Sequence, residues 1–324
     1  MSERALFLGI DTSNYTTSVA VADSDGHILL NLKRLLPVKE GERGLRQSDA
    51  LFAHTKNLPL LMQELGQFLE GMGDDVKIAA VGCSATPRDA EGSYMPCFLA
   101  GVSAAETACA VLGCRKYSFS HQNGHVMAAL YSSGKTELLE QGEPFAAFHV
   151  SGGTTELLLV TPLENGFVIN QIGGSADMNA GQAIDRTGVM MGLRFPCGRE
   201  MESICIGQPY RKGKISVKGL DCNLSGLENL AAAHYKKTDS AEETSAYVLE
   251  YVAATLDKMT EKLRETHPEM PIIYAGGVMS NKLIKSRLAY RPDVYFASPA
   301  FSADNAAGIA LLCRRRYLQA ERRK

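Results

Sequence analysis

The same short arrangement occurs twice in this chain: a buried strand, a small polar turn and a second strand. The first copy spans residues 5–22 and has Asp11-Thr12-Ser13-Asn14 as its turn, and the second spans residues 144–161 and has Ser151-Gly152-Gly153-Thr154-Thr155. Short apolar runs bounded by turn residues are typical of buried strands. We interpret the two copies as an internal duplication, which predicts that the second half of the chain repeats the scheme of the first.

The length and composition of the chain predict two domains, each with a hydrophobic core. The chain has 324 residues, of which 45% are apolar and 22% charged, and a chain of this length usually divides into two domains. The formal net charge of −2 gives no general sign of nucleic-acid binding, and we interpret the basic run Arg314-Arg315-Arg316 as a solvated helix face rather than an RNA patch.

The eight cysteines form no C-x-x-C pair, so we expect reduced thiols in the core.

The remaining pattern predicts strands and helices in alternation. Residues 76–83 read as a buried strand that ends in the polar loop 84–93, and ligands of open α/β sheets bind at that end, so we expect this loop to contact substrate. No stretch approaches the roughly 18 apolar residues of a membrane span, and residues 1–4 lead directly into a strand. We therefore expect a cytoplasmic protein. Further helices are expected at about 47–70, 97–112, 120–131, 241–266 and 303–320.

Two histidines four residues apart indicate a metal site. His121 and His125 would point the same way from one helix, which Ser120 is placed to cap, and Asp304 offers a third ligand ahead of the last helix. Gln122 stands where a metalloprotease needs its glutamate base, so peptidase activity is not expected. Two His and one Asp suit iron as well as zinc. The alternative is a capped surface helix with two ordinary histidines.

Glycine turns and isolated polar residues indicate an anion and nucleoside site. Ser151-Gly152-Gly153 lets backbone N–H groups converge on a phosphate, and Gly276-Gly277 leads into a helix that we expect to be capped near Ser280. Asn281 can hydrogen-bond a ribose or base. Asp185 can accept from ribose hydroxyls, with Gly198 allowing a close backbone approach; alternatively Asp185 pairs with Arg186 or a lysine. Asp11 either holds a metal-bound phosphate or water, or only satisfies its own turn.

Several motifs follow one another in a fixed order along the chain. They are Gly9-Ile10-Asp11-Thr12-Ser13, His121-x-x-x-His125, Val150-Ser151-Gly152-Gly153, Gly181-x-Ala183-x-Asp185, Asp221-x-x-x-Ser225-Gly226-Leu227, Ala275-Gly276-Gly277-Val278-x-x-Asn281 and Asp304-Asn305. Taken together, these motifs resemble the TsaD (Gcp, YgjD) family, once labelled as glycoproteases, and the match runs nearly from end to end. The family has the actin/Hsp70/sugar-kinase fold, an α/β architecture of two duplicated lobes with a central nucleotide cleft. It transfers a threonylcarbamoyl group from its adenylate to a tRNA adenosine next to the anticodon.

The resemblance implies a role for each motif. His121, His125 and Asp304 would bind iron or zinc, and Asp11 and Ser151 would be catalytic. ATP or threonylcarbamoyl-adenylate would be the nucleotide ligand, and the partners would be tRNA and TsaB-like and TsaE-like proteins or a second copy of the chain. We place the lobes at residues 1–130 and 131–302, with a last helix at about 303–324 packing back on the first lobe. The nucleotide would be held by Ser151, Gly152, Gly153, Thr154, Asp185, Gly198, Gly276, Gly277 and Asn281.

The chain departs from the family pattern around the substrate. Thr154 stands where the family has histidine, Glu228 replaces a usual lysine, and the loop after the strand 76–83 is longer. We interpret the chain as a divergent paralogue. Besides a metal-assisted transferase, two alternatives remain open: a non-catalytic nucleotide-binding paralogue in a tRNA-modification complex, and a small-molecule carbamoyltransferase or kinase-like enzyme on the same fold.

Overall fold

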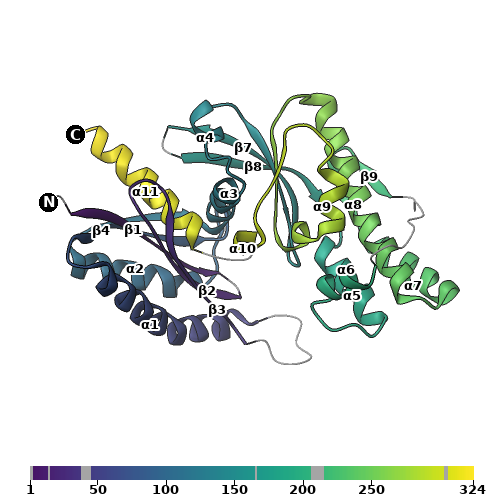
Figure 1. The fold of residues 1–324 in the computed structure, drawn as a ribbon, viewed down its shortest axis with the longest axis horizontal. Helices are drawn as coiled ribbons and strands as arrows, with labels where there is room; N and C mark the ends of the chain where they lie inside the picture. Colours follow the sequence, from purple (N-terminus) through teal and green to yellow (C-terminus); the bar gives the residue numbers. More distant parts are fainter. Residues whose placement is uncertain (1–2, 14, 38–44, 165, 206–214, 303–305) are drawn as a thin grey trace. The chain divides into compact units, whose positions relative to one another are not determined.

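The computed structural model describes residues 3–13, 15–37, 45–164, 166–205, 215–302 and 306–324 (Figure 1). The chain forms two compact units. The first contains residues 1–131, 162–168 and 303–324, and the second contains residues 132–161 and 169–302. Each unit has a sheet of its own.

The sheet of the first unit has five strands in the order β3-β2-β1-β4-β5. The three strands at one side are antiparallel neighbours, whereas β4 and β5 run parallel to β1. A hairpin followed by two crossovers produces this order, because parallel neighbours need a connection across a face of the sheet. The strands are β1 (Arg4–Ser13), β2 (Thr16–Ala22), β3 (Ile28–Leu35), β4 (Val76–Thr86) and β5 (Arg115–Ser120).

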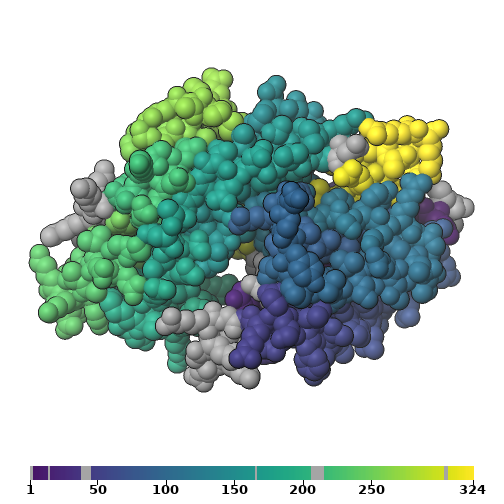
Figure 2. Space-filling view, turned by 180° about the vertical axis from the view of Figure 1, so that it is seen from behind, coloured from purple at the N-terminus to yellow at the C-terminus, as the bar shows by residue number. Residues whose placement is uncertain are grey.

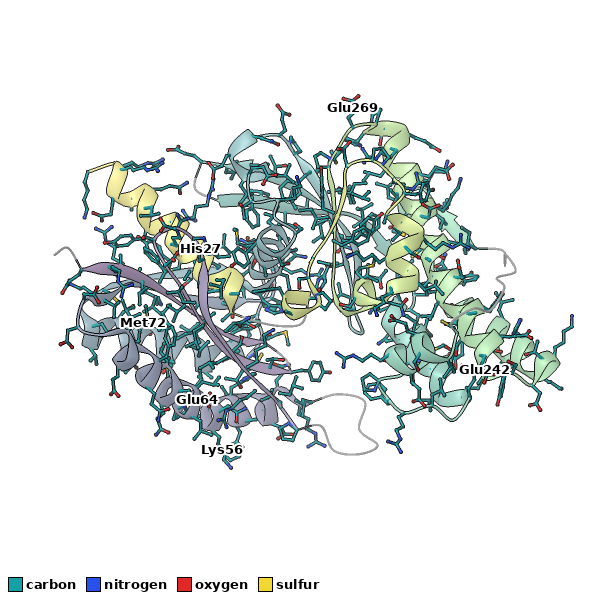
Figure 3. All side chains as sticks on the ribbon, in the orientation of Figure 1. His27, Lys56, Glu64, Met72, Glu242 and Glu269 are labelled. Carbon is teal, nitrogen blue, oxygen red and sulfur yellow. The ribbon has the colours of Figure 1, made fainter. Side chains whose placement is uncertain are left out.

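Helices cover both faces of this sheet. Successive side chains of a strand point to opposite faces, and in β1 a Cβ at Gly9 would meet Ala306 and Ala310, whereas Ile10 lies against Gly101 of the opposite layer. The layer on the Gly9 side is α11 (Ala307–Arg322), which is yellow in Figures 1 and 2 and lies against the other segments of its own unit. The other layer consists of α1 (Gln47–Met72) and α2 (Phe98–Leu112), and on α1 Lys56 and Glu64 point outward in Figure 3.

The second unit repeats the strand order of the first. Its seven strands lie in the order β12-β11-β6-β7-β8-β10-β9, so that β8-β7-β6-β11-β12 matches β3-β2-β1-β4-β5. The pairings match as well, since β6 is antiparallel to β7 and parallel to β11. The duplication expected from the two turns is therefore present in the topology. The strands are β6 (Phe145–Val150), β7 (Thr155–Leu163), β8 (Gly166–Ser175), β9 (Ser216–Lys218), β10 (Asp221–Asn223), β11 (Ile272–Ala275) and β12 (Val294–Phe296).

The core of the second unit is built on one long amphipathic helix. Helix α8 (Ala241–Thr266) buries Val248, Leu249, Val252 and Leu256 in the cluster that also holds the apolar side chains of β6 and β11. Its N-cap is Ser240, whose hydroxyl accepts from the Glu243 N–H. The other helices are α3 (His121–Ser132), α4 (Leu138–Gln141), α5 (Ala180–Met190), α6 (Gly198–Ile204), α7 (Ser225–Thr238), a 3₁₀ turn η1 (Gly277–Ser280), α9 (Lys282–Leu288) and α10 (Pro299–Ser302).

Several local expectations have a clear outcome. The Ser120 hydroxyl accepts from the Asn123 N–H, as a cap of the histidine helix should. The cap expected near Ser280 is one residue further on: the chain first makes η1, and the side chain of Asn281 accepts from the Ile284 N–H at 3.1 Å. All eight cysteines are free thiols, and seven are buried. In the described part of the chain, no helix is both long and apolar enough to cross a membrane.

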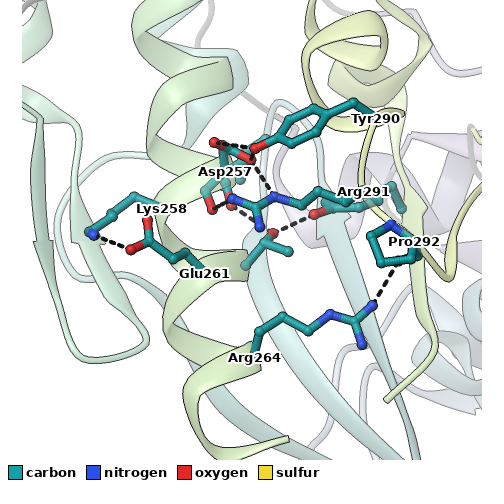
Figure 4. A network of polar contacts seen from close by, with 10 residues as sticks. Asp257, Lys258, Glu261, Arg264, Tyr290, Arg291 and Pro292 are labelled. Carbon is teal, nitrogen blue, oxygen red and sulfur yellow. Dashed lines mark hydrogen bonds and ion pairs between the residues drawn. The ribbon is translucent and has the colours of Figure 1, made fainter. Parts of the chain in front are cut away.

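A network of polar side chains lies close to β11, next to the buried Tyr274. Asp257 of α8 binds the Arg291 guanidinium at 2.5 Å and the Tyr290 hydroxyl at 3.2 Å (Figure 4). Tyr274 is fully buried between the rings of Phe148 and Phe296, at centroid distances of 4.9 and 5.2 Å. Its hydroxyl bonds the hydroxyl of Thr260, which itself donates to the Leu256 carbonyl. Tyr274 is therefore the donor in this bond.

Tyr274 should make the stability of the chain sensitive to alkaline pH. Burial raises the pKa of Tyr274 well above its ordinary value. The folded chain then keeps the phenol proton when the unfolded chain releases it, so stability falls as the pH rises past about 10. We expect Tyr274→Phe to lose about 1 kcal/mol at neutral pH and to weaken this alkaline loss, measured as urea unfolding midpoints at about pH 8 and about pH 11. Equal alkaline losses in both proteins would contradict the prediction.

Candidate functional site

Asp11 is the centre of a buried polar cluster in the first unit. Its side chain is fully buried, and β1 continues through it to Ser13, so Asp11 lies inside the strand rather than at the tip of a turn. The Ser13 hydroxyl donates to one carboxylate oxygen at 2.7 Å, and the Ser84 hydroxyl donates to the other. His121 Nδ1 is 3.0 Å from that second oxygen. A carboxylate with these three donors is well stabilised without solvent.

The contact with Asp11 determines which ring nitrogen of His121 could bind a metal ion. An ionised carboxylate only accepts hydrogen bonds, so the Nδ1 of the neutral His121 ring carries the proton and Nε2 is the nitrogen with the lone pair. The ring of His125 lies 4.2 Å from that of His121, nearly perpendicular at 75°. A histidine oriented by a carboxylate and paired with a second imidazole is the usual arrangement around a bound transition metal. These residues fit the metal site that the sequence indicates, whereas Asp304 lies outside the described residues.

The surroundings of α3 explain its position. The Gln122 N–H donates to the Pro87 carbonyl, and the Asn123 amide donates to Asp89 at 2.7 Å, so the loop after β4 holds the first turn of the helix. Gly124 lets α11 approach, because a Cβ there would lie 3.0 Å from Ile309. The loop expected to contact substrate thus contacts the histidine helix.

Another group of ligand-type side chains lies on the turn between β2 and β3. Asp23, Asp25 and His27 have ligand atoms within 4.8 Å of one another, and within the described ranges no other group of three meets this criterion. His27, labelled in Figure 3, is largely exposed, and its Nδ1 lies 3.2 Å from Asp23. The Asp23 carboxylate also accepts the N–H groups of Asp25 and His27. These bonds close an ordinary turn, so we assign no function to the group.

In the second unit, the turn after β6 presents free N–H groups. The Ser151 N–H donates to the Thr154 carbonyl at 2.7 Å and closes the turn. Gly152 and Gly153 are exposed, and their N–H groups donate to no acceptor among the described residues. Gly181 brings α5 against this turn, because a Cβ there would lie 2.6 Å from the Cα of Gly152. Consecutive unpaired amides in a tight turn suit an anion such as a phosphate.

The glycine turn after β11 lies beside this one. Gly276 has φ +100°, and a Cβ there would lie 2.2 Å from the carbonyl oxygen of Val150, the residue before Ser151. Gly277 then begins η1, which contacts α5. Asn281 is nearly buried, and because its Oδ1 caps α9, its Nδ2 remains as the donor for a ligand.

Asp185 and Gly198 are joined through Cys197. The Asp185 carboxylate accepts the Cys197 N–H at 2.7 Å, which places Gly198, the first residue of α6, beside it. Burial raises the pKa of Asp185, although the bond from Cys197 opposes this effect. The alternative pairing of Asp185 with Arg186 was wrong: the Arg186 guanidinium lies 3.3 Å from Glu228. Glu228, one of the departures from the family pattern, is therefore neutralised by a neighbour.

Two contributors to these sites were missed from the sequence. Ser84 follows a buried strand and was treated only as part of a loop, although the end of β4 lies beside β1 and hence beside Asp11. Asn179 donates from its side chain to the Gly153 carbonyl at 2.8 Å and so holds the phosphate-type turn. Asparagine ahead of a helix is a common cap signal, and this signal could have identified Asn179.

Comparison with known proteins identifies the family. The family model for tRNA N6-adenosine threonylcarbamoyltransferase, TsaD, matches residues 43–311. The chain belongs to the TsaD family. The family model describes a transferase that modifies tRNA, so membership supports the transferase class for this chain.

Solved structures agree with this family in fold. The dehydratase activator of Clostridium difficile, solved with bound ADPNP, has a TM-score of 0.51 and 12% identity, and the match covers 99% of this chain and 98% of the activator. Full-length HypF, in a phosphate- and nucleotide-bound form, has a TM-score of 0.58 at 12% identity; HypF of T. kodakarensis has 0.57 at 11%. This chain spans 46% and 48% of these two HypF chains. The fold is that of actin, Hsp70 and the sugar kinases, as expected.

Proposed function

We propose that this chain transfers a threonylcarbamoyl group from its adenylate to a tRNA adenosine, using a divalent metal held by His121, His125 and Asp304. The family match supports the reaction, and the observation that carries the proposal is the buried Asp11 carboxylate bonded to His121. A simple capped surface helix does not need a desolvated carboxylate that fixes one tautomer of its first histidine. A bound ion would polarise the carbamoyl or phosphate oxygen.

The other residues bind and orient the nucleotide in this proposal. The N–H groups of Gly152 and Gly153 receive a phosphate, with Ser151 and Thr154 flanking the turn. Asp185 accepts from a ribose hydroxyl, and the Asn281 Nδ2 donates to the nucleoside. Asp11 touches no solvent, so it acts as a positioning residue for His121 rather than on the reactants.

Single-turnover transfer tests the proposed reaction. Metal-loaded protein would be mixed with labelled threonylcarbamoyl-adenylate and unmodified tRNA, alone and with TsaB-like and TsaE-like proteins. We expect label on tRNA with the wild type, a loss of at least about 100-fold with His125→Ala, and full transfer with the control His27→Ala, whose histidine is exposed. If the adenylate binds but no label moves, the tRNA acceptor is wrong and small carbamoyl acceptors become the candidates.

Asp185→Asn should separate nucleotide binding from stability. The amide can still accept the Cys197 N–H, and a partly buried charge disappears, so folding stability should stay level or rise. Adenine-nucleotide affinity should fall about 10–100-fold, because a charge-assisted bond to ribose is lost. Since burial raises the pKa of Asp185, wild-type affinity should also decline on acidification earlier than for an ordinary carboxyl group. Calorimetric titration with the nucleotide measures the affinity and its dependence on pH, and the control is Asp239→Asn, which changes an exposed carboxylate. If the affinity of Asp185→Asn is unchanged, Asp185 does not belong to the nucleotide site.

A further inference from the structure

Two cysteines face each other where α2 ends and β5 begins. Helix α2 stops at Gly113, which has φ +63° and donates its N–H to the Cys109 carbonyl. The Cys114 N–H donates to the same carbonyl at 3.2 Å. Such an i to i+5 bond is typical of a helix C-terminus closed by glycine, in which the side chains at its two ends come into contact. Here both of those side chains are thiols.

The two sulfur atoms are close enough to join after a small movement. Cys109 Sγ and Cys114 Sγ are 3.6 Å apart. A disulfide bond has an S–S length of about 2.05 Å and a Cα separation of about 4.4–6.8 Å. The glycine turn brings the two backbones together already, so rotation of the side chains supplies most of the remaining approach. No other atom lies within 4 Å of the Cβ position at Gly113, so the turn has room to adjust.

The two thiols differ in their exposure to solvent. Cys109 is nearly buried, whereas Cys114 is the one cysteine of the chain that is partly exposed. Burial raises the pKa of the Cys109 thiol to about 12, and the adjacent Cys114 adds to this effect. Cys109 alone is therefore a poor target for an oxidant, because the thiolate is the reactive form. An oxidant reaches Cys114 first.

We propose that Cys109 and Cys114 are a reversible dithiol that hydrogen peroxide converts to a disulfide, joining the end of α2 to the start of β5. Peroxide oxidises the Cys114 thiol to a sulfenic acid and releases one water. The Cys109 sulfur then attacks the Cys114 sulfur; the S–O bond breaks, the Cys109 proton leaves with the hydroxide as a second water, and the S–S bond forms. Two thiols lose two electrons in total, and peroxide gains them. An added dithiol reverses the reaction by exchange.

The neighbouring thiols define the alternative pairings. Cys83 of β4 and Cys313 of α11 are buried thiols in the neighbourhood of this pair. The Cys83 thiol forms a long hydrogen bond with the Ser118 hydroxyl, at 3.9 Å. A link from Cys114 to either of these buried thiols would join separate elements of the unit, whereas Cys109 and Cys114 belong to one turn of the chain and have their sulfur atoms 3.6 Å apart.

Mass analysis of the full chain tests the proposal. After treatment with peroxide and blocking of free thiols, cleavage after glutamate releases residues 107–137, which contain only Cys109 and Cys114. We expect this peptide to be unblocked and lighter by two hydrogen atoms, and to accept the blocking reagent at both cysteines after reduction. We also expect oxidation to raise the Tm by about 4 °C or more in the wild type and in Cys97→Ala, but not in Cys114→Ser.

Three results would overturn the proposal: two blocked thiols in this peptide after oxidation, over-oxidation of Cys114 without a link, or a link to Cys83 or Cys313. The wild-type measurement decides the question without any variant, so failure of Cys114→Ser to fold would not affect it. The readout needs neither tRNA nor metal and is therefore independent of the proposed transferase reaction.

Discussion

Asp11→Asn is expected to lower metal affinity about 10–100-fold while the chain stays folded, because residues that orient a metal-binding histidine usually have effects of that size. The substitution keeps the shape of the side chain but removes the charge that holds the proton on His121 Nδ1. One of the two serine hydroxyls can turn around to pair with the new amide. His121 then loses its fixed tautomer, and Nε2 is no longer held ready for an ion.

The measurement is metal content after purification together with titration against a chelator of known affinity. The control is Asp49→Asn, which removes an exposed carboxylate from the first turn of α1. His121→Ala should abolish metal binding, and it therefore gives the metal content expected when the site is lost. If Asp11→Asn and Asp49→Asn bind metal equally well, Asp11 serves the fold alone and the support for the metal site disappears.

Gly308→Ala should destabilise the first unit by at least about 1–3 kcal/mol and weaken metal binding with it. A Cβ at this position would lie 1.9 Å from the Gly124 carbonyl oxygen and 3.0 Å from the Ala128 backbone nitrogen. Both contacts are with backbone, so no side chain can move aside. The helices α11 and α3 must separate, and α3 carries His121 and His125.

Gly66→Ala is the matched control for this substitution. Gly66 also lies inside a helix, α1, but a Cβ there would meet nothing within 4 Å. Alanine is the better helix former, so this variant should gain about 0.5–1 kcal/mol. Urea unfolding measures both variants, and opposite signs are expected. If Gly308→Ala proves as stable as Gly66→Ala, the two helices are not packed as described.

The sequence predicts the elements with strong apolar patterns and misses the others. The strands β1, β2 and β4 and the helices α1, α2 and α8 lie within a few residues of their expected bounds, since each has a regular set of buried positions. Helix α7 was not predicted, and it buries only Leu227 and Ala231. Strands β9 and β10 have three residues each, which is too short for a periodic signal.

For the candidate sites, the residue types were predictable but their contacts were not. His121 and His125 share a face because of their spacing, and spacing is visible in a sequence. Asp11 was expected at a turn, but it is buried under Ser84, which is 73 residues away, and such pairing depends on strand order. Asn281 rather than Ser280 caps its helix because η1 takes up the preceding residues. A local pattern cannot reveal a partner that only the fold brings near.

The position of α11 has a consequence for the order in which the chain can fold. Helix α11 packs on β1, although about 300 residues separate them in the chain. During synthesis, all residues assigned to the second unit are made before those of α11. The second unit can therefore condense while the first still lacks one face of its sheet. The histidine helix gains its packing partner only when residues 307–322 have left the ribosome, so an ion would be captured only after both units of this chain have been synthesised.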